Sequence, residues 1–107
     1  MKILLVDDNV LILRATSRLL TSRGHEVLAY QDHAMAVLLA TAWADVALVD
    51  VDMPERTGPE LVQQTFPKSL PVVFYTGNPQ GAPKGARVLE KPATADQIID
   101  ALVRAIG

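Results

Sequence analysis

The sequence predicts an α/β domain built on a doubly wound, five-stranded parallel sheet with strand order 2-1-3-4-5. Short, continuous apolar runs, which are typical of buried parallel strands, alternate along the chain with stretches of helical periodicity. Three of these runs stop at polar residues: Asp7-Asp8, Asp50 and Thr76-Gly77. Strands that alternate with helices form parallel sheets through right-handed crossovers, and five strands in this pattern fit the order given.

Length and composition favour one folded domain over residues 1–107. A chain of this length buries roughly 65% of its unfolded surface, which is enough for one hydrophobic core. Hydrophobic residues make up 50% of the sequence, so disorder is not expected. The absence of cysteine excludes disulfides, zinc–thiolate sites and thiol chemistry.

Charge and hydropathy limit the kinds of partner and the cellular location that we expect for the chain. A net charge of −2 offers no basic patch for nucleic acid. No apolar run reaches the roughly 18 residues of a membrane span, and the N-terminus turns acidic at Asp7 where a signal peptide would stay apolar. We therefore expect a cytoplasmic domain that neither crosses a membrane nor binds nucleic acid directly.

The first part of the chain reads as a strand, a helix and an edge strand. An apolar strand is expected over residues 2–6 and a helix over about 10–22, which Gly24 ends. The helical wheel directs one apolar stripe toward the core: Leu11, Ile12, Ala15 and Leu19. Leu13 and Leu20 lie off that stripe, which leaves them as scattered surface leucines or as part of a docking face. Residues 25–29 are less apolar and fit an edge strand.

A second helix is expected from an Asp32 cap to about Thr41, followed by the central strand at residues 46–50. The residues of this helix that are expected to pack are Val37, Leu38 and Ala40. Trp43 fits a packing residue rather than a ligand platform. Neither histidine, His25 or His33, has a companion at a metal-ligand spacing, so neither is expected to bind metal or act as a base.

Proline and glycine divide the second half of the chain. The expected elements are a helix over residues 59–66 and strands over 71–75 and 87–89. Between those strands, five of the ten residues 77–86 are Gly or Pro, so an ordinary helix is not expected there. Thr94 and Gln97 form a capping box that opens a last helix to about Ile106. The apolar arc of that helix is wide: Ile98, Ile99, Ala101, Leu102, Val103, Ala105 and Ile106.

The polar residues that end the strands form a candidate site at one edge of the sheet. In this flavodoxin-like order the first and third strands are neighbours, so Asp7, Asp8 and Asp50 should converge. Like charges about 4 Å apart cost on the order of 4 kcal/mol at an effective dielectric of ~20, and a hard cation such as Mg²⁺ relieves that repulsion. Thr76 adds a hydroxyl and Lys91 a positive charge. Together these groups describe a phosphoryl acceptor in which the Asp50 carboxylate attacks in line.

Each of these residues also has an ordinary structural explanation. Asp8-Asn9 fits a helix cap, Thr76-Gly77 fits a turn, and Lys91 fits a solvated charge. Their joint position at the carboxyl ends of four predicted strands favours a shared site.

On these residues the chain resembles the receiver domains of two-component response regulators over nearly its whole length. The matching features are Asp7-Asp8, Asp50 with Met53-Pro54 and Gly58, Thr76-Gly77, and Lys91-Pro92. The resemblance implies that Asp50 accepts a phosphoryl group from a phosphohistidine on a sensor histidine kinase or a histidine phosphotransfer protein. It also implies that the domain is not an enzyme in the usual sense, although it catalyses its own phosphorylation and dephosphorylation.

The resemblance assigns roles to the other residues of the site. The direct Mg²⁺ ligands would be Asp8, Asp50 and the backbone carbonyl of Asp52. Asp7 would act on the metal mainly through water. Thr76 would move toward the bound phosphoryl group, and Lys91 would contact its oxygens. Asp52 and Asn78 occupy positions that tune the dephosphorylation rate in the family.

Two departures from the family affect the face through which most relatives signal or dimerise. The family's fourth helix is replaced here by the Gly/Pro-rich residues 77–86, and the aromatic three residues before the lysine is Val88. We expect the chemistry to survive while the usual readout changes. The wide arc of the last helix, with Leu13 and Leu20, either supplies a new contact surface or covers core left bare by the missing helix. A downstream protein, an output domain or a second copy of the chain are the partners left open.

Two other functions are weighed against this one. A degenerate receiver would act as a phosphorylation-independent interaction module. A haloacid-dehalogenase-type phosphatase would use Asp50-Val-Asp52, but that pattern requires Thr where Pro54 stands and an acidic pair late in the chain. The phosphoacceptor reading accounts for more of the sequence than either.

Overall fold

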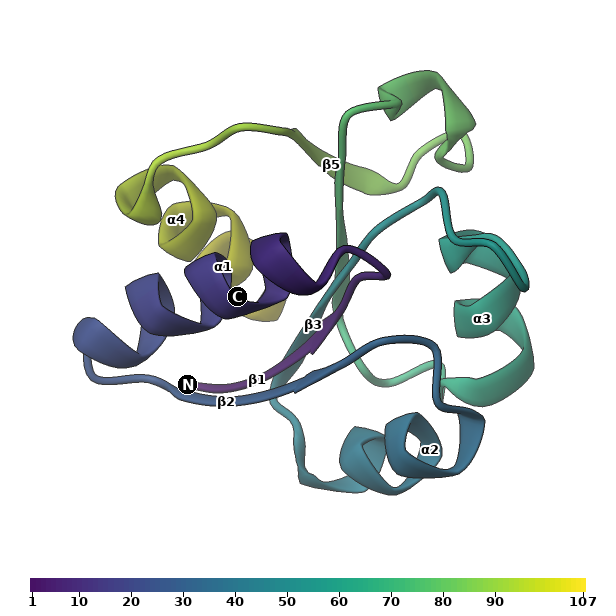
Figure 1. The fold of residues 1–107 in the computed structure, drawn as a ribbon, viewed down its shortest axis with the longest axis horizontal. Coiled ribbons are helices and arrows are strands. Elements are labelled where there is room, and N and C mark those ends of the chain that lie inside the picture. The colour runs from purple at the N-terminus through teal and green to yellow at the C-terminus, as the bar shows by residue number, and fades with distance from the viewer.

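Five parallel strands form one sheet in the order β2-β1-β3-β4-β5, with helices on both faces (Figure 1). The computed structural model describes all residues from 1 to 107. The strands are β1 (Lys2–Val6), β2 (Glu26–Tyr30), β3 (Val46–Val49), β4 (Val72–Thr76) and β5 (Arg87–Glu90). The helices are α1 (Val10–Ser22), α2 (Ala34–Trp43), α3 (Gly58–Thr65) and α4 (Ala95–Ile106), with a short 3₁₀ helix, η1 (Pro79–Gly81). The predicted fold class and strand order are confirmed.

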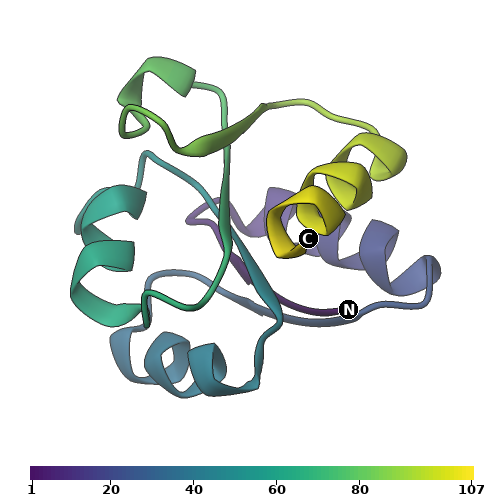
Figure 2. The same cartoon turned by 180° about the vertical axis from the view of Figure 1, so that it is seen from behind.

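The sheet separates two hydrophobic cores, as Figures 1 and 2 show from opposite sides. Helices α1 and α4 cover one face, above the core of Ile3, Leu5, Leu13, Leu20, Val46, Leu48, Val73, Tyr75, Ile98, Leu102 and Ala105. Helices α2 and α3 cover the other, above Leu4, Val6, Val37, Ala40, Ala47, Val49, Val51, Met53, Leu61, Phe66, Leu70 and Phe74. Central strands are buried on both faces, which explains their unbroken apolar runs.

Helix α1 packs through a different face from the one predicted. Its buried residues are Leu13, Thr16 and Leu20, whereas Leu11 is 75% exposed and Leu19 is 42% exposed. The predicted stripe was therefore wrong, and Leu13 and Leu20 belong to the core rather than to a surface. Leucines occupy two arcs of this helix and the buried arc includes a polar residue, so periodicity alone did not identify the packed side.

Helix α2 begins at a different cap from the one predicted. His33 is the N-cap and its side chain makes no capping bond. Asp32 instead accepts hydrogen bonds from Arg56, so its expected capping role was wrong. Leu38 is 47% exposed, and Thr41 is buried beside Val37 in its place. The helix carries no charged residue, which left the pattern without a polar side to orient it.

Residues 77–86 contain only η1 and turns, as predicted, and α4 opens at the predicted Thr94–Gln97 capping box. A helix that connected β4 to β5 through a right-handed crossover would lie on the same face of the sheet as α2 and α3. Two alanines of the segment, Ala82 and Ala86, pack against that core instead. Helix α4 lies on the opposite face, so its apolar arc does not cover core left by the absent helix.

No helix of the structure combines the length and the apolar character that crossing a membrane would require.

Candidate functional site

The polar residues at the strand ends lie along the carboxyl edge of the sheet and are anchored there by backbone bonds. The Asp7 N–H donates to the Tyr30 carbonyl at 3.1 Å, and the Asp50 N–H donates to the Val6 carbonyl at 2.9 Å. The Lys91 N–H donates to the Thr76 carbonyl at 2.9 Å. These bonds extend the ladder past the last strand residues, so the side chains project from the rigid part of the fold.

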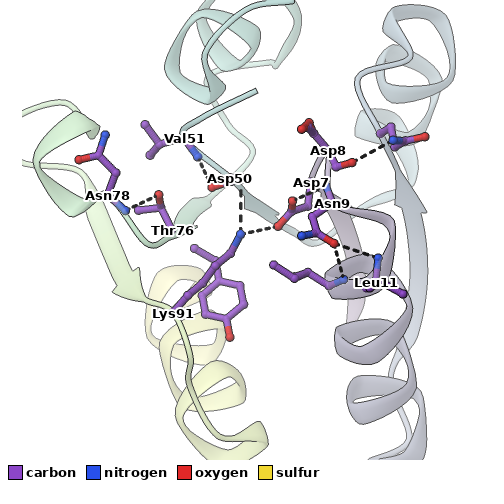
Figure 3. Close-up of polar contacts among 12 residues, drawn as sticks. Asp7, Asp8, Asn9, Leu11, Asp50, Val51, Thr76, Asn78 and Lys91 are labelled. Carbon is purple, nitrogen blue, oxygen red and sulfur yellow. Dashed lines mark hydrogen bonds and ion pairs between the residues drawn. The ribbon is translucent and has the colours of Figure 1, made fainter. Parts of the chain in front are cut away.

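The Lys91 ammonium lies between two of the carboxylates (Figure 3). Its Nζ is 2.6 Å from Asp7 Oδ2 and 3.5 Å from Asp50 Oδ2. The side chains are 2% exposed for Asp7, 12% for Asp50 and 16% for Lys91. Charges this far removed from water need close partners, and the ammonium is the counter-charge that the two acids share.

The Asp50 carboxylate is held by a backbone hydrogen bond and is also repelled by the negative charge of Asp7. Its Oδ1 accepts a hydrogen bond from the Val51 N–H at 2.8 Å. Burial raises the pKa of Asp50, and the negative charge of Asp7 raises it further. The Lys91 ammonium and the Val51 bond oppose that rise without cancelling it. Asp50 is therefore a carboxylate whose negative charge is only partly compensated.

The turn after β1 holds Asp7 and Asp8 in different surroundings. Asp7 Oδ1 accepts from the Asn9 N–H at 2.9 Å, and Asn9 Oδ1 in turn caps α1 at Leu11 and Ile12. The Asp8 carbonyl accepts from Gln31 Nε2 at 2.9 Å. The Asp8 side chain points away from the Lys91 ammonium, and its Oδ1 is buried yet accepts no hydrogen bond.

The acids of the predicted metal site are neighbours without forming a single cluster. No group of three or more Asp, Glu, His or Cys side chains is gathered closely enough to hold a metal ion. Lys91 instead joins Asp7 to Asp50, and Asp8 stands beside the pair. The donor types suit Mg²⁺, which binds carboxylate and carbonyl oxygens, and the buried Asp8 Oδ1 is an acceptor whose needs a cation would meet.

Thr76 and Asn78, one of the two predicted tuning positions, lie on the opposite side of Asp50 from Asp7 and Asp8 (Figure 3). Thr76 is 1% exposed, and its Oγ1 accepts from the Asn78 N–H at 2.9 Å. The Asp52 and Asn78 side chains are exposed and approach each other only to 3.5 Å, between Asn78 Nδ2 and Asp52 Oδ1. Asp52 thus lies at the open side of the site.

The loop after β3 brings in residues that the sequence reasoning missed. Arg56 donates to both carboxylate oxygens of Asp32, at 3.0 and 2.9 Å, which ties this loop to the start of α2. Gly58 packs so tightly that an added Cβ would lie 1.9 Å from the Asp50 carbonyl oxygen. The sequence indicated a glycine in this loop and the family resemblance included Gly58, but neither indicated its close packing against Asp50. The partners of Arg56 and Gln31 lie more than twenty residues away, so no local pattern indicates them.

The larger hollows of the surface lie elsewhere. The largest, about 520 Å³, is lined by α1 and β2, and a second, about 410 Å³, is lined by β5 and α4. A third, about 250 Å³, borders Asp8 and Glu55. Asp50 lines none of them. Its carboxylate sits at a shallow, polar edge that suits a small anionic group better than a drug-sized ligand.

Comparisons with known proteins agree with the geometry. The family model for the response regulator receiver domain matches residues 3–103. The receiver domain of the hybrid histidine kinase CckA is 26% identical, with 100% of both chains covered and a TM-score of 0.80. A response regulator receiver domain protein from Clostridium thermocellum is 29% identical, covering 98% of this chain and 93% of that one, with a TM-score of 0.80. The chemotaxis response regulator CheY4 of Vibrio cholerae is 30% identical, covering 97% of each chain, with a TM-score of 0.77. No curated protein matches the chain.

Proposed function

The chain belongs to the response regulator receiver domain family, and on that premise we propose that it accepts a phosphoryl group on Asp50. An Asp50 oxygen attacks the phosphorus of a phosphohistidine, and the bond between phosphorus and the imidazole nitrogen breaks. The observation that carries this proposal is the placement of the Asp50 carboxylate 3.5 Å from the Lys91 ammonium, at the carboxyl edge of the sheet and with 12% of the side chain exposed. The ammonium neutralises charge on the phosphoryl oxygens as the transfer proceeds.

Mg²⁺ is the cofactor proposed for this reaction. Its ligands would be Asp8, Asp50 and the Asp52 carbonyl, with Asp7 acting through water. The bound cation would neutralise negative charge on the phosphoryl group. The buried Asp8 Oδ1 that accepts no hydrogen bond supports this assignment, because a buried acceptor of this kind otherwise has no favourable partner.

Phosphorylation must change an interaction in order to signal. It adds close to two negative charges at this edge. Thr76 and residues 77–86 are the proposed switch, because Thr76 ends β4, the strand paired with the one that Asp50 follows, and the segment has little regular structure to lose. The proposed donor is a sensor histidine kinase or a histidine phosphotransfer protein, and the recipient is a downstream protein, an output domain or a second copy of the chain.

A second function, a degenerate receiver that is never phosphorylated, is favoured by one feature of the site. The Lys91 ammonium is closer to Asp7 than to Asp50, and three carboxylates do not gather around one point. In that reading the lysine substitutes permanently for a cation, and the domain binds its partners in one state.

Labelling with a small phosphodonor separates the two functions. The protein is incubated with acetyl phosphate and Mg²⁺, and its intact mass is measured. A phosphoacceptor gains one acid-stable, base-labile phosphoryl group, and Asp50→Asn gains none. Asp52→Asn is the matched control, since it removes an exposed carboxylate from the same loop and should still be labelled. An unlabelled wild-type chain that still binds its partners would favour the degenerate receiver.

A further inference from the structure

Tyr75 is a buried aromatic residue that the phosphoacceptor chemistry leaves without a role. It immediately precedes Thr76 on β4 and is 6% exposed. Because side chains alternate along a strand, Tyr75 faces the α1/α4 core while Phe74 faces the α2/α3 core. Its neighbour across the sheet is Leu89 on β5, two residues before Lys91.

Tyr75 contacts the lysine segment at two points. Its ring centroid is 5.6 Å from the Lys91 ammonium, within the range at which an aromatic face attracts a cation. Its Oη accepts a hydrogen bond from the Ala93 N–H at 3.0 Å. The Lys91 N–H is itself bonded to the Thr76 carbonyl. The chain is thus tied to β4 both at the lysine and two residues beyond it.

We infer that Tyr75 is the positioning residue that holds the Lys91 ammonium in reach of Asp50, an inference that rests on the proposed phosphoacceptor function. Lysine has a long side chain with many rotamers, and the Asp7 carboxylate at 2.6 Å competes for it. The ring and the two carboxylates confine the ammonium, while the Ala93 bond holds the backbone from which the side chain starts.

The neighbouring strand offers no substitute for this ring. On β5, Val88 is 38% exposed and pairs with Phe74, so it faces the side away from Tyr75. Leu89 faces the same side as Tyr75 but is aliphatic. The aromatic contact to the lysine therefore comes from β4 alone.

The test compares Tyr75→Leu and Tyr75→Phe with a control, Phe74→Leu. The control removes an aromatic ring from the next residue of the same strand, at similar burial, on the face that does not contact Lys91. The first measurement is the initial rate of Asp50 phosphorylation by acetyl phosphate with Mg²⁺. Relative to the control, Tyr75→Leu is expected to slow it about tenfold. This is less than the roughly hundredfold loss that a 1 Å misplacement can cause, because Asp7 and Asp50 still attract the ammonium. Tyr75→Phe keeps the ring and should lose only roughly threefold, as expected for one hydrogen bond.

The second measurement needs neither metal nor phosphorylation. An amine-acylating reagent is applied to the protein alone, and the modification of each lysine is followed by peptide mass mapping. Lys91 is 16% exposed, whereas Lys68 is exposed and serves as the internal reference. Tyr75→Leu should raise the acylation of Lys91 relative to Lys68 several-fold, and Phe74→Leu should leave that ratio as in the wild type.

The outcomes distinguish this inference from the proposed function. A wild-type chain that takes up no phosphoryl group refutes the phosphoacceptor function, and acylation alone then decides the role of Tyr75. If the chain is phosphorylated, equality of Tyr75→Leu and Phe74→Leu in either measurement overturns the inference. Should Tyr75→Leu fail to fold, Tyr75→Phe decides it, because loss of the Ala93 bond alone should still raise Lys91 acylation.

Discussion

Two loops leave the carboxyl ends of the central strands β3 and β4, and they are built in opposite ways. The loop after β3, residues 51–57, is fixed by the core. Val51 is 1% exposed and Met53 is 8% exposed. The Gly58 N–H donates to the Val51 carbonyl at 2.7 Å, and Arg56 makes two bonds to Asp32 at the start of α2. This loop is therefore anchored in the core by Val51 and Met53 and bonded near its end, while its other side chains are mostly exposed.

The loop after β4, residues 77–86, is attached at its start, by two small side chains and at Gly81, where an added Cβ would lie 2.8 Å from Val51 Cγ1. Thr76 Oγ1 accepts a hydrogen bond from the Asn78 N–H at the point where the loop begins. Ala82 and Ala86 are the members that pack against the core, and both are only partly buried. Three turn bonds each join residues three positions apart, so they stabilise the loop locally without fastening it to the sheet.

The difference between the two loops corresponds to two requirements of a receiver domain: a fixed phosphoacceptor and a segment that can change conformation. Asp50 needs a constant position, and the loop that follows it is held by burial. A switch needs two conformations of similar free energy, and a segment with few buried contacts can change at small cost. The structure thus places a loop anchored by buried side chains and a less deeply buried loop at the same edge of the sheet as the Asp50 carboxylate.

The largest expected effect tests whether the first loop is as tightly fixed as its packing indicates. Gly58→Ala would place a Cβ 1.9 Å from the Asp50 carbonyl oxygen and 3.2 Å from Val49 Cγ1. Relief requires backbone movement, so we expect a loss of about 3 kcal/mol, the upper end of the usual cost of overpacking, in the free energy of unfolding by urea. Gly77→Ala is the matched control in the second loop. Its Cβ would meet nothing within 4 Å, and the change should stay within about 0.5 kcal/mol. Equal losses at the two glycines would contradict the comparison.

The parts of the fold that the sequence predicted correctly are those where a local pattern and the tertiary structure agree. The central strands β1, β3 and β4 are buried on both faces and end at polar residues, so their positions and their shared edge followed from the apolar runs. The capping box at Thr94 and Gln97 is formed within four residues, so it too could be read directly. The absence of a helix at 77–86 followed from the conformational limits of Gly and Pro.

The errors occur where a distant residue decides the outcome. Asp32 was expected to cap α2, but its side chain pairs with Arg56. That partner is 24 residues away, so no local pattern indicated the pairing. The side of α1 that is buried depends on how the helix packs against the sheet and α4. Leucines lie on two sides of this helix, so the sequence alone did not show which side packs. In the site, the sequence indicated that Asp7, Asp8 and Asp50 share an edge. It could not show that Lys91 reaches between Asp7 and Asp50 while Asp8 stays apart.

A smaller effect should show how the second loop is joined to the site. Thr76→Val keeps the shape of the side chain but removes the Oγ1 acceptor, leaving the Asn78 N–H unpaired. We expect a loss of about 1–2 kcal/mol in the free energy of unfolding. Asn78→Ala removes only an exposed side chain and its long contact to Asp52, so it should change stability by less than about 0.5 kcal/mol. If Asn78→Ala were the more costly of the two, the Asp52 contact rather than the Thr76 hydroxyl would hold the loop.

The smallest expected effect, and the only one expected to stabilise the folded protein, comes from removing the negative charge of Asp50. Burial and Asp7 raise the pKa of Asp50 in the folded state, so the folded chain retains this proton to higher pH than the unfolded chain. Stability therefore falls as pH rises from the ordinary carboxyl range through the raised pKa, and the whole loss is present above it. Asp50→Asn removes this cost while Lys91 keeps its 2.6 Å partner Asp7. At pH 7 we expect the variant to be more stable by on the order of 1 kcal/mol, a common size for a single substitution. Urea unfolding across pH 3.5–8, values chosen to bracket the ordinary carboxyl range, should show the difference shrinking as the pH falls. A variant less stable than the wild type at pH 7 would mean that attraction to Lys91 outweighs burial and repulsion at this position.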